Sequence, residues 1–296
     1  MADEDAIIAA MSFRSCVLAF ALPLVIAGCP SAGDDDDSVE DPTPPPGPVY
    51  SGGTCPTLED GRNTGFESAG IEREFELLLP DEPHMAPVVF VWHWLNGEAD
   101  EILEYMEFED LPADEGAIVI APEARDEPAF EWDFLAGASD NPDMQFFEDL
   151  LSCVHEQYWV DMDRVYSTGM SAGGLWTSFL TLHESEWLAA TAPFSGGATS
   201  DTYLIPARRI PVMVTWGGPT DFAVGFNFDQ GSRYLSEELQ ADGSFVVECE
   251  HNAGHVPTDT AKDDAWRFFE DHPMGVDPSP WTDELPDSLP SFCRLP

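Results

Sequence analysis

The sequence predicts an α/β fold in which a doubly wound, mostly parallel sheet carries helices on both faces. From Cys55 onward, short apolar runs alternate with segments of helical periodicity. The runs contain few polar residues, which indicates strands buried on both sides, as in a parallel sheet. Alternation of strand and helix favours the same architecture. The expected strands are residues 75–79, 88–92, 117–121, 165–168, 189–194, 212–216 and 245–249.

Helix signals stand between these runs. Asn141 is a favourable N-cap, Pro142 suits the first helical position, and Asp143 belongs to the first turn. The apolar residues that follow recur at helical spacing and form one face; they are Phe146, Phe147, Leu150, Leu151 and Val154. Residues 99–106 and 260–270 show a similar pattern and are expected to be helical.

The charge balance excludes some partners. The chain has 57 acidic and 11 basic residues, for a formal net charge of −46. Because nucleic acids and anionic membrane surfaces are bound through Lys and Arg, we expect neither as a partner, and we expect a monomer. Salt screens the self-repulsion of such a chain, so the acidity indicates either adaptation to a saline environment or solubility alone.

The N-terminus resembles a bacterial export signal. Arg14 precedes an apolar run over residues 16–27, which is too short to span a bilayer comfortably. Residues 26–29 (Ile-Ala-Gly-Cys) look like the lipobox of lipoproteins, whose cysteine is lipidated. We therefore predict a signal peptide over residues 1–28, with Met11 as a possible true start, and a lipid anchor at Cys29 as the only membrane contact. Ordinary secretion, with Cys29 incidental, is the alternative.

Residues 29–53 are expected to form a disordered tether ahead of one catalytic domain over residues 54–296. The tether contains the charge run 34–37 and a proline-rich stretch, so it cannot bury enough apolar surface to fold. The four aspartates of that run are read as a solvated spacer, with calcium binding as the alternative. The domain keeps four cysteines, which allow up to two disulfides in an exported chain, in any of three pairings; they are Cys55, Cys153, Cys249 and Cys293. No C-x-x-C spacing occurs, so no zinc site is expected.

The strongest chemical signal is the segment Gly-Met-Ser-Ala-Gly-Gly at residues 169–174, which follows an expected strand and precedes a helical run at residues 175–182. A G-x-S-x-G motif in this context is the nucleophile elbow of α/β-hydrolases. Ser171 would be the nucleophile, and the backbone N–H of Ala172 would stabilise an oxyanion at the start of the helix. The alternative is a structural glycine-rich turn.

A serine nucleophile needs a base, and the base needs an orienting acid. In α/β-hydrolases the chain order is serine, acid, histidine. Asp221 lies in the loop after the expected strand 212–216, where sites form at the sheet's carboxyl edge; Asp229 is the weaker candidate. His255 follows the last expected strand and fits the base, with His251 as its rival. His272 comes after the final helix and is expected at the surface.

Several segments together resemble poly(3-hydroxybutyrate) depolymerase and feruloyl esterase-like enzymes. They are the apolar strand leading into His93, the helix opening at residues 143–146, the Val-Asp-x-x-Arg-Val-Tyr sequence at residues 160–166, the elbow, the Asp221 loop and the Gly-His pair at residues 254–255. The resemblance covers residues 75–255 and implies an α/β-hydrolase fold. It also implies that the second oxyanion donor is the N–H of Leu95, although this chain has Trp94 where the family usually has glycine.

The same resemblance indicates where the substrate binds. Residues 131–134 (Glu-Trp-Asp-Phe) are similar to an aromatic stretch near the family's substrate cleft. Trp132 and Phe134 would then line the cleft, with Trp94 and Trp216 nearby. Packing in the core or at the rim is the alternative for each of these aromatic residues.

These features predict a serine esterase that works by two-step acyl transfer and uses no metal or organic cofactor. Only 50 positions separate Ser171 from Asp221, which leaves no room for a cap domain. An open cleft suits bulky, polymeric or plant-derived esters, such as polyhydroxyalkanoate or feruloyl and acetyl esters. The alternatives are a peptidase or amidase on the same fold and a surface-anchored binding protein without turnover.

Overall fold

A mixed sheet forms the centre of the molecule. The structure, a computed structural model, describes residues 46–125 and 130–296. Within these residues the sheet has nine strands in the order β1-β2-β4-β3-β5-β6-β7-β10-β11, and the six from β4 to β10 run parallel. The strands are β1 (Gly61–Ser68), β2 (Ile71–Leu78), β3 (Val88–Trp92), β4 (Ile118–Pro122), β5 (Val165–Met170), β6 (Ala190–Phe194), β7 (Val212–Trp216), β10 (Val246–Glu250) and β11 (Cys293–Arg294).

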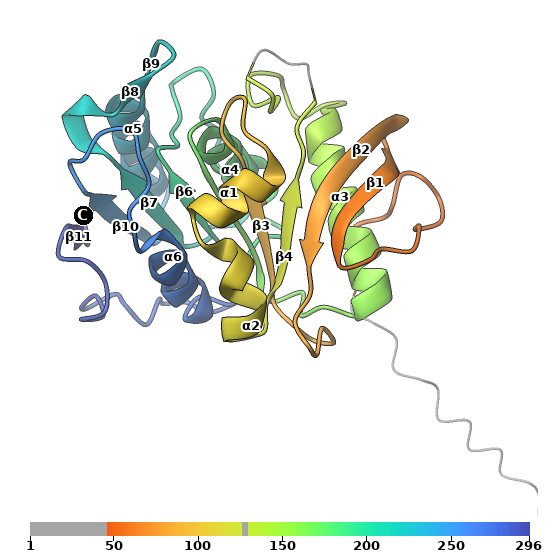
Figure 1. Ribbon diagram of the computed structural model, residues 1–296. Helices are drawn as coiled ribbons and strands as arrows, with labels where there is room; N and C mark the ends of the chain where they lie inside the picture. Colours follow the sequence, from red (N-terminus) through yellow and green to blue (C-terminus); the bar gives the residue numbers. More distant parts are fainter. Residues whose placement is uncertain (1–45, 126–129) are drawn as a thin grey trace, which may run out of the picture. The chain divides into compact units, whose positions relative to one another are not determined.

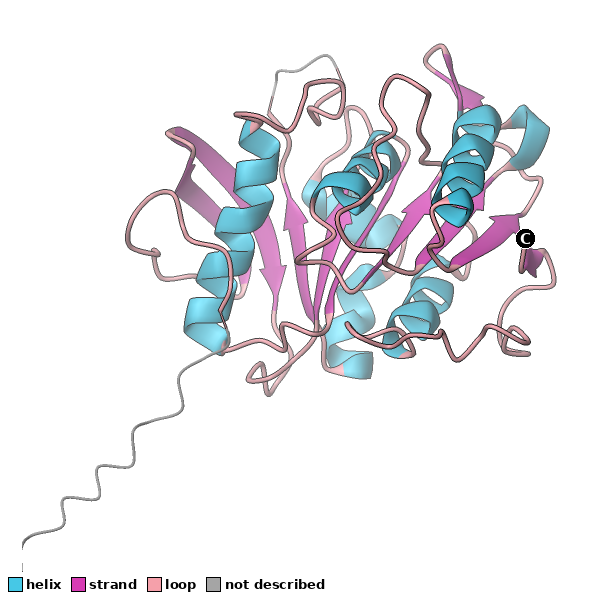
Figure 2. Ribbon diagram, turned by 180° about the vertical axis from the view of Figure 1, so that it is seen from behind, coloured by secondary structure: helices cyan, strands magenta, loops and turns pink. Residues whose placement is uncertain are grey.

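Helices cover both faces of this sheet. One face carries α1 (Ala99–Tyr105), the 3-10 turn η1 (Phe108–Asp110), α2 (Leu111–Glu115) and α6 (Ala261–Glu270), as Figure 1 shows. The opposite face carries α3 (Pro142–Tyr158), α4 (Ala172–His183) and α5 (Phe228–Ala241), seen in Figure 2. The short turn η2 (Gly218–Thr220) and a separate hairpin of β8 (Phe222–Ala223) and β9 (Phe226–Asn227) follow β7.

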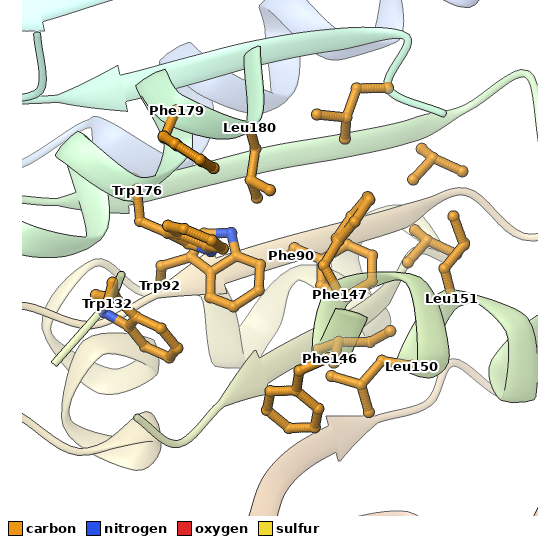
Figure 3. Close-up of a cluster of buried hydrophobic side chains, with 14 of the residues drawn as sticks. Phe90, Trp92, Trp132, Phe146, Phe147, Leu150, Leu151, Trp176, Phe179 and Leu180 are labelled. Atoms are coloured by element: carbon orange, nitrogen blue, oxygen red, sulfur yellow. The ribbon is translucent and has the colours of Figure 1, made fainter. Parts of the chain in front are cut away.

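The apolar strands divide their side chains between two cores. In β3, Phe90 and Trp92 belong to the cluster under α3, α4 and α5, whereas Val89 and Val91 belong to the cluster under α1, α2 and α6. Figure 3 shows the first cluster, where Phe90 meets Phe147 of α3 at a ring-centroid distance of 4.7 Å. Burial on both faces explains the continuous apolar runs.

The predicted fold class is confirmed. Each expected strand and helix is present, and most lie within about two residues of their predicted bounds, an agreement no finer than the definition of element ends. Strand β2 begins at Ile71, ahead of its predicted start at residue 75, and α4 begins at Ala172, ahead of the predicted residue 175. Strand β1, the antiparallel direction of β2, helix α5 and the two-residue β11 were not predicted. Strand β1 is largely exposed and reads Gly-Arg-Asn-Thr-Gly-Phe-Glu-Ser, so it lacks an apolar pattern.

The folded unit begins earlier than the predicted start at residue 54. The hydroxyl of Tyr50 donates to the carbonyl of Glu67, and both the N–H and the hydroxyl of Ser51 donate to the Asp149 carboxylate. The predicted tether therefore reaches too far at its C-terminal end. The predicted signal peptide, the lipidation site Cys29 and the aspartate run 34–37 lie outside the described residues. Among the described residues, no helix has the length and apolarity needed to cross a membrane.

Two disulfides join the four cysteines of the domain. Cys55 pairs with Cys153 of α3, and Cys249 of β10 pairs with Cys293, its direct cross-strand neighbour in β11. The expectation of up to two disulfides is confirmed, and the structure selects one of the three pairings that the sequence leaves open. The two links fasten the segment before β1 and the C-terminal segment to the sheet and its helices.

The prediction for His272 is wrong. This side chain is fully buried, and its ring nitrogens lie 2.6 Å from the Phe268 carbonyl and 2.6 Å from the Ser279 hydroxyl. The segment after α6 folds back and places Trp281 against the imidazole, with ring centroids 5.1 Å apart. Burial lowers the pKa of His272, so the neutral form is favoured there.

A buried carboxyl at the end of α4 provides a test of stability against pH. Glu184 is 3% exposed, and burial, with the nearby charges of Glu148 and Glu186, raises its pKa to about 8. Since the folded state holds this proton more tightly than the unfolded state, the group's contribution to stability is lost as pH rises from about 4.5 to about 8. Glu184→Gln should therefore exceed the wild type in unfolding free energy above pH 8, by on the order of 3 kcal/mol.

Urea unfolding at pH 5 and pH 8.5 measures this effect. The difference between the Glu184→Gln variant and the wild type should grow across that interval. Glu237→Gln is the matched control, because Glu237 is exposed and is not among the charges that raise the Glu184 pKa. An equal difference at both pH values would contradict the prediction.

Candidate active site

Ser171 lies on a strained turn between β5 and α4. Its backbone has φ 61° and ψ −115°, a conformation that costs energy for any residue but glycine. The flanking chain passes close to β3: a Cβ at Gly173 would stand 1.9 Å from the Trp92 carbonyl oxygen, and one at Gly169 would stand 2.6 Å from the same atom. Glycine is therefore required at both positions. The turn has the geometry of a nucleophile elbow, with Ala172 as the first residue of α4.

A continuous chain of hydrogen bonds leads from Ser171 to a buried carboxylate. The Oγ atom of Ser171 lies 2.8 Å from Nε2 of His255, and Nδ1 of His255 lies 2.7 Å from Oδ1 of Asp221. Asp221 is completely buried, and its Oδ2 accepts hydrogen bonds from the Ser195 hydroxyl and the Gly217 N–H. With both carboxylate oxygens engaged, Nδ1 of His255 carries the proton and Nε2 is free to accept one from Ser171.

Two loops at the carboxyl ends of β7 and β10 bring the acid and the histidine together. The Gly254 N–H donates to the Gly217 carbonyl, and a Cβ at Gly217 would stand 1.8 Å from the Gly254 carbonyl oxygen. The loops can approach this closely only because Gly217 has no side chain. Phe228 of α5 packs against the His255 ring at a centroid distance of 4.4 Å and limits how the imidazole can turn.

The rival candidates occupy other places. Asp229 accepts hydrogen bonds from Trp216 Nε1 and Arg233, so its carboxylate serves the packing of α5 on β7. His251 accepts a hydrogen bond from the Ala253 N–H at Nδ1, and its ring faces Phe292. The structure brings Asp221 and His255, rather than these two, to Ser171.

The loop after β3 is held by side chains from residues 131 and 132. The Asn96 N–H donates to Oε2 of Glu131 at 2.7 Å, and Nε1 of Trp132 donates to the His93 carbonyl at 3.0 Å. Nδ1 of His93 lies 2.8 Å from the Trp94 carbonyl, while Nε2 accepts from the Ala124 N–H. Leu95 is thus fixed between anchored neighbours, beside Ser171.

Two cavities meet at Ser171. The larger cavity has a volume of about 430 Å³, and His255 is on its wall. The smaller cavity has a volume of about 220 Å³, and Ala172 is on its wall. Three residues line both: Leu95, Ser171 and Val224. The serine therefore stands where two separate parts of one substrate can be bound.

Comparison with known proteins supports the interpretation of the structure as an α/β-hydrolase fold. The model of the prolyl oligopeptidase family matches residues 105–202, which include the elbow. An oxidized polyvinyl alcohol hydrolase from a Pseudomonas species is 26% identical, covering 76% of this chain and 80% of that protein. Feruloyl esterase D from Neurospora crassa is 25% identical, covering 62% of this chain and 60% of that protein.

Solved structures show the same architecture. The native structure called pOPH superposes with a TM-score of 0.67 at 22% identity, covering 82% of this chain and 97% of that one. A ferulic acid esterase superposes with a TM-score of 0.52 at 16% identity, covering 66% of this chain and 90% of that one. The chain therefore has the α/β-hydrolase fold. The resemblance noted in the sequence is thereby confirmed at the level of the fold.

The aromatic residues predicted to bind substrate divide into two groups. Trp94 lines the larger cavity and Phe134 lines the smaller one. The prediction is wrong for Trp132 and Trp216, which are 1% and 0% exposed and lie on neither cavity wall. Trp132 packs against Trp92 and Trp176 in the core, as Figure 3 shows. The ring of Trp216 is enclosed, and its Nε1 is bonded to Asp229.

Several residues of the candidate site were missed by the sequence analysis. Ser195 directly follows β6, so the rule that sites gather at the carboxyl ends of parallel strands pointed to it. Phe228 and Val224 gave no signal, because nothing local links the segment after Asp221 to the serine. Glu131 was seen only as part of an aromatic stretch.

The Glu131 contact predicts a loss of activity without a loss of binding. In Glu131→Ala the Asn96 N–H loses its acceptor, so the loop that carries Leu95 becomes less well positioned. The resemblance predicts that the Leu95 N–H is an oxyanion donor, and removal of such a donor costs about 10²–10³ in kcat. We therefore expect a smaller decrease of roughly 10-fold, with KM little changed. Glu131→Gln keeps an acceptor oxygen and should recover most of the rate. Steady-state kinetics on one activated ester measures this, and equal losses in both variants would contradict it.

Proposed function

We propose that this α/β-hydrolase is a serine esterase in which Ser171 is the nucleophile, His255 the general base and Asp221 the acid that orients it. The proposal rests on one observation: a chain of hydrogen bonds runs from Ser171 through His255 to the buried Asp221. Ser171, at the open end of this chain, lines two largely apolar cavities. This is the arrangement that activates a serine hydroxyl for acyl transfer.

The reaction proceeds in two steps. His255 Nε2 takes the proton of Ser171 as Oγ bonds to the ester carbonyl carbon, and N–H groups of Leu95 and Ala172 stabilise the oxyanion. The bond to the alcohol oxygen then breaks, and His255 returns its proton to that oxygen. Water, deprotonated by His255, hydrolyses the acyl-enzyme and regenerates Ser171. Asp221 keeps the imidazole tautomer correct and stabilises the imidazolium.

Bulky or polymeric esters are the proposed substrates. Between Ser171 and Asp221 the chain forms one helix and two strands of the common fold and no cap. Three apolar side chains at the cavity mouths are more than half exposed: Tyr105, Leu135 and Val224. The oxidized polyvinyl alcohol hydrolase and the feruloyl esterase support the same class, which includes polyhydroxyalkanoate, feruloyl and acetyl esters.

The match to the prolyl oligopeptidase family makes peptide hydrolysis the second candidate. The cavities argue for esters, because the smaller one has no charged or amide side chain to hold a peptide backbone. Amide and ester analogues with the same acyl group separate the two. A kcat/KM for the amide equal to that for the ester would favour the peptidase.

The deciding experiment uses the purified full-length hydrolase with p-nitrophenyl acetate and butyrate, at low and molar salt, beside Ser171→Ala. Turnover in the wild type alone, with covalent labelling of Ser171 by a fluorophosphonate probe, would support the esterase. Higher activity in molar salt would support the saline interpretation of the charge. A folded wild type with neither turnover nor labelling would favour a binding protein.

Export is proposed together with this activity. The two disulfides suit an oxidising compartment outside the cytosol. Lipidation at Cys29 remains a prediction of the sequence, tested by incorporation of labelled palmitate in the wild type and its absence in Cys29→Ser.

A further inference from the structure

The two cavities beside Ser171 differ in the catalytic groups that they contain. His255 lines only the larger cavity, together with Trp94 and Tyr105. Ala172 lines only the smaller cavity, together with Leu175 and Phe226. The proton donor therefore lies to one side of the serine, and the proposed oxyanion donor at the start of α4 lies to the other.

This asymmetry fixes the direction in which an ester can bind. When the tetrahedral intermediate collapses, His255 Nε2 must reach the alcohol oxygen to protonate it. The alcohol oxygen therefore faces the larger cavity. The carbonyl oxygen points toward Ala172 and Leu95, and the acyl chain continues away from His255. Resting on the esterase function proposed above, we propose that the smaller cavity binds the acyl chain and the larger cavity binds the alcohol.

The smaller cavity limits the acyl group. Apart from Ser171 itself, all its lining residues are apolar, among them Leu135, Leu175, Phe226 and Phe228. Burial of a carboxylate or ammonium group there, without a partner, would be strongly unfavourable. The volume of about 220 Å³ is below the range of roughly 300–1,000 Å³ that accommodates drug-sized ligands. The acyl group is therefore short or contains a single ring, and it is uncharged.

The larger cavity accepts a more varied alcohol. It has about twice the volume, and Asn96 adds a polar side chain to its wall. Tyr105 at its edge is 56% exposed, so a substrate can extend past it into solvent. A polymer would place one acyl unit in the smaller cavity and leave the remaining chain on the alcohol side, beyond the mouth.

Val224 separates the two binding regions. It forms the tip of the β8–β9 hairpin with Gly225, lines both cavities and is 65% exposed. Its φ of 43° is unusual for a β-branched residue and is strained. An exposed apolar side chain held in such a conformation adds nothing to folding, whereas it supplies an apolar wall on each side of Ser171. Val224 is thus a specificity-determining residue for both parts of the ester.

Kinetics on two ester series tests the assignment in the full-length hydrolase. One series varies the acyl group from acetate to octanoate with p-nitrophenol, and the other varies the alcohol with butyrate. Leu175→Ala enlarges the smaller cavity and should raise the octanoate-to-acetate ratio of kcat/KM by about 10-fold or more, since one methylene is worth about 10–200-fold in an apolar pocket. Tyr105→Ala should change only the ranking of alcohols. Val224→Gly should alter selectivity in both series.

The acyl-enzyme gives a sharper readout. After the alcohol has left, only the acyl group remains bound, so the deacylation rate constant from burst kinetics should change in Leu175→Ala and stay constant in Tyr105→Ala. Leu135→Ala, at a 64% exposed position of the smaller cavity, replaces Leu175→Ala if that variant fails to fold. Acyl selectivity that follows Tyr105 instead would overturn the assignment. Absence of Ser171-dependent turnover on every ester would instead refute the esterase.

Discussion

Alanine at Ser171, alanine at His255 and both changes together are each expected to lower kcat for an activated ester by roughly 10⁵–10⁶. The two side chains share one hydrogen bond of 2.8 Å, through which the nucleophile gives up its proton. If either side chain is removed, the other can no longer contribute to catalysis, so the losses in kcat should not add. The residual rate would come from the oxyanion donors and from substrate binding in the two cavities.

Single-turnover and steady-state kinetics on p-nitrophenyl butyrate measure these losses. KM should change little, because the apolar residues that remain around both positions form most of the cavity walls. His251→Ala is the matched control, since His251 lies in the same loop but turns toward Phe292. A double variant much slower than both single variants would show that Ser171 and His255 act independently, and an inactive His251→Ala would reopen the choice of base.

Asp221→Asn is expected to lower kcat by about 10⁴ while the protein remains folded. The carboxylate accepts hydrogen bonds at both oxygens, from His255 at Oδ1 and from Ser195 and Gly217 at Oδ2. An amide has only one acceptor oxygen. If it faces Ser195 and Gly217, its NH₂ group faces His255 and favours the wrong imidazole tautomer.

Asp229→Asn is the matched control for this prediction. Asp229 is the other aspartate near the end of β7, but it is bonded to Trp216 and Arg233. Its replacement should leave kcat within a few-fold of the wild type. Ser195→Ala should have an intermediate effect of roughly 10-fold, because Gly217 still donates to Oδ2. The rates of all three variants are measured with one ester. If Asp229 were the acid, Asp229→Asn would be the slowest variant and Asp221→Asn would stay close to the wild type.

Local sequence patterns predicted most of the fold, because each pattern reflects a physical requirement that acts within a short stretch of chain. Buried strands such as β3 and β5 must be apolar on both faces, and the helix α3 carries its own cap at Asn141. Strand β1 escaped prediction because it is an exposed edge strand. It is held mainly by pairing with β2 and by Phe66, a single buried ring.

The aromatic residues show where local patterns stop being informative. Trp94, Trp132 and Trp216 all stand near the ends of strands or in loops close to the site, yet only Trp94 lines a cavity. A tryptophan in such a position is equally suited to the core and to the cleft. Whether the ring is buried or lines the cleft depends on which side chains pack against it. The ring of Trp132 is covered by Trp176 of α4.

The sequence by itself determined the α/β architecture, the elbow at Ser171 and the order of a candidate acid and histidine behind it. These depend on the period of apolar residues and on glycines that a tight turn requires within a few positions. Only the tertiary structure decided the pairing of the cysteines, the meeting of Asp221 and His255 through Gly217 and Gly254, and the place of Val224 between two cavities. The reason is that these contacts join segments far apart in the chain, and the close approach of their backbones is settled by how helices and loops pack on the sheet.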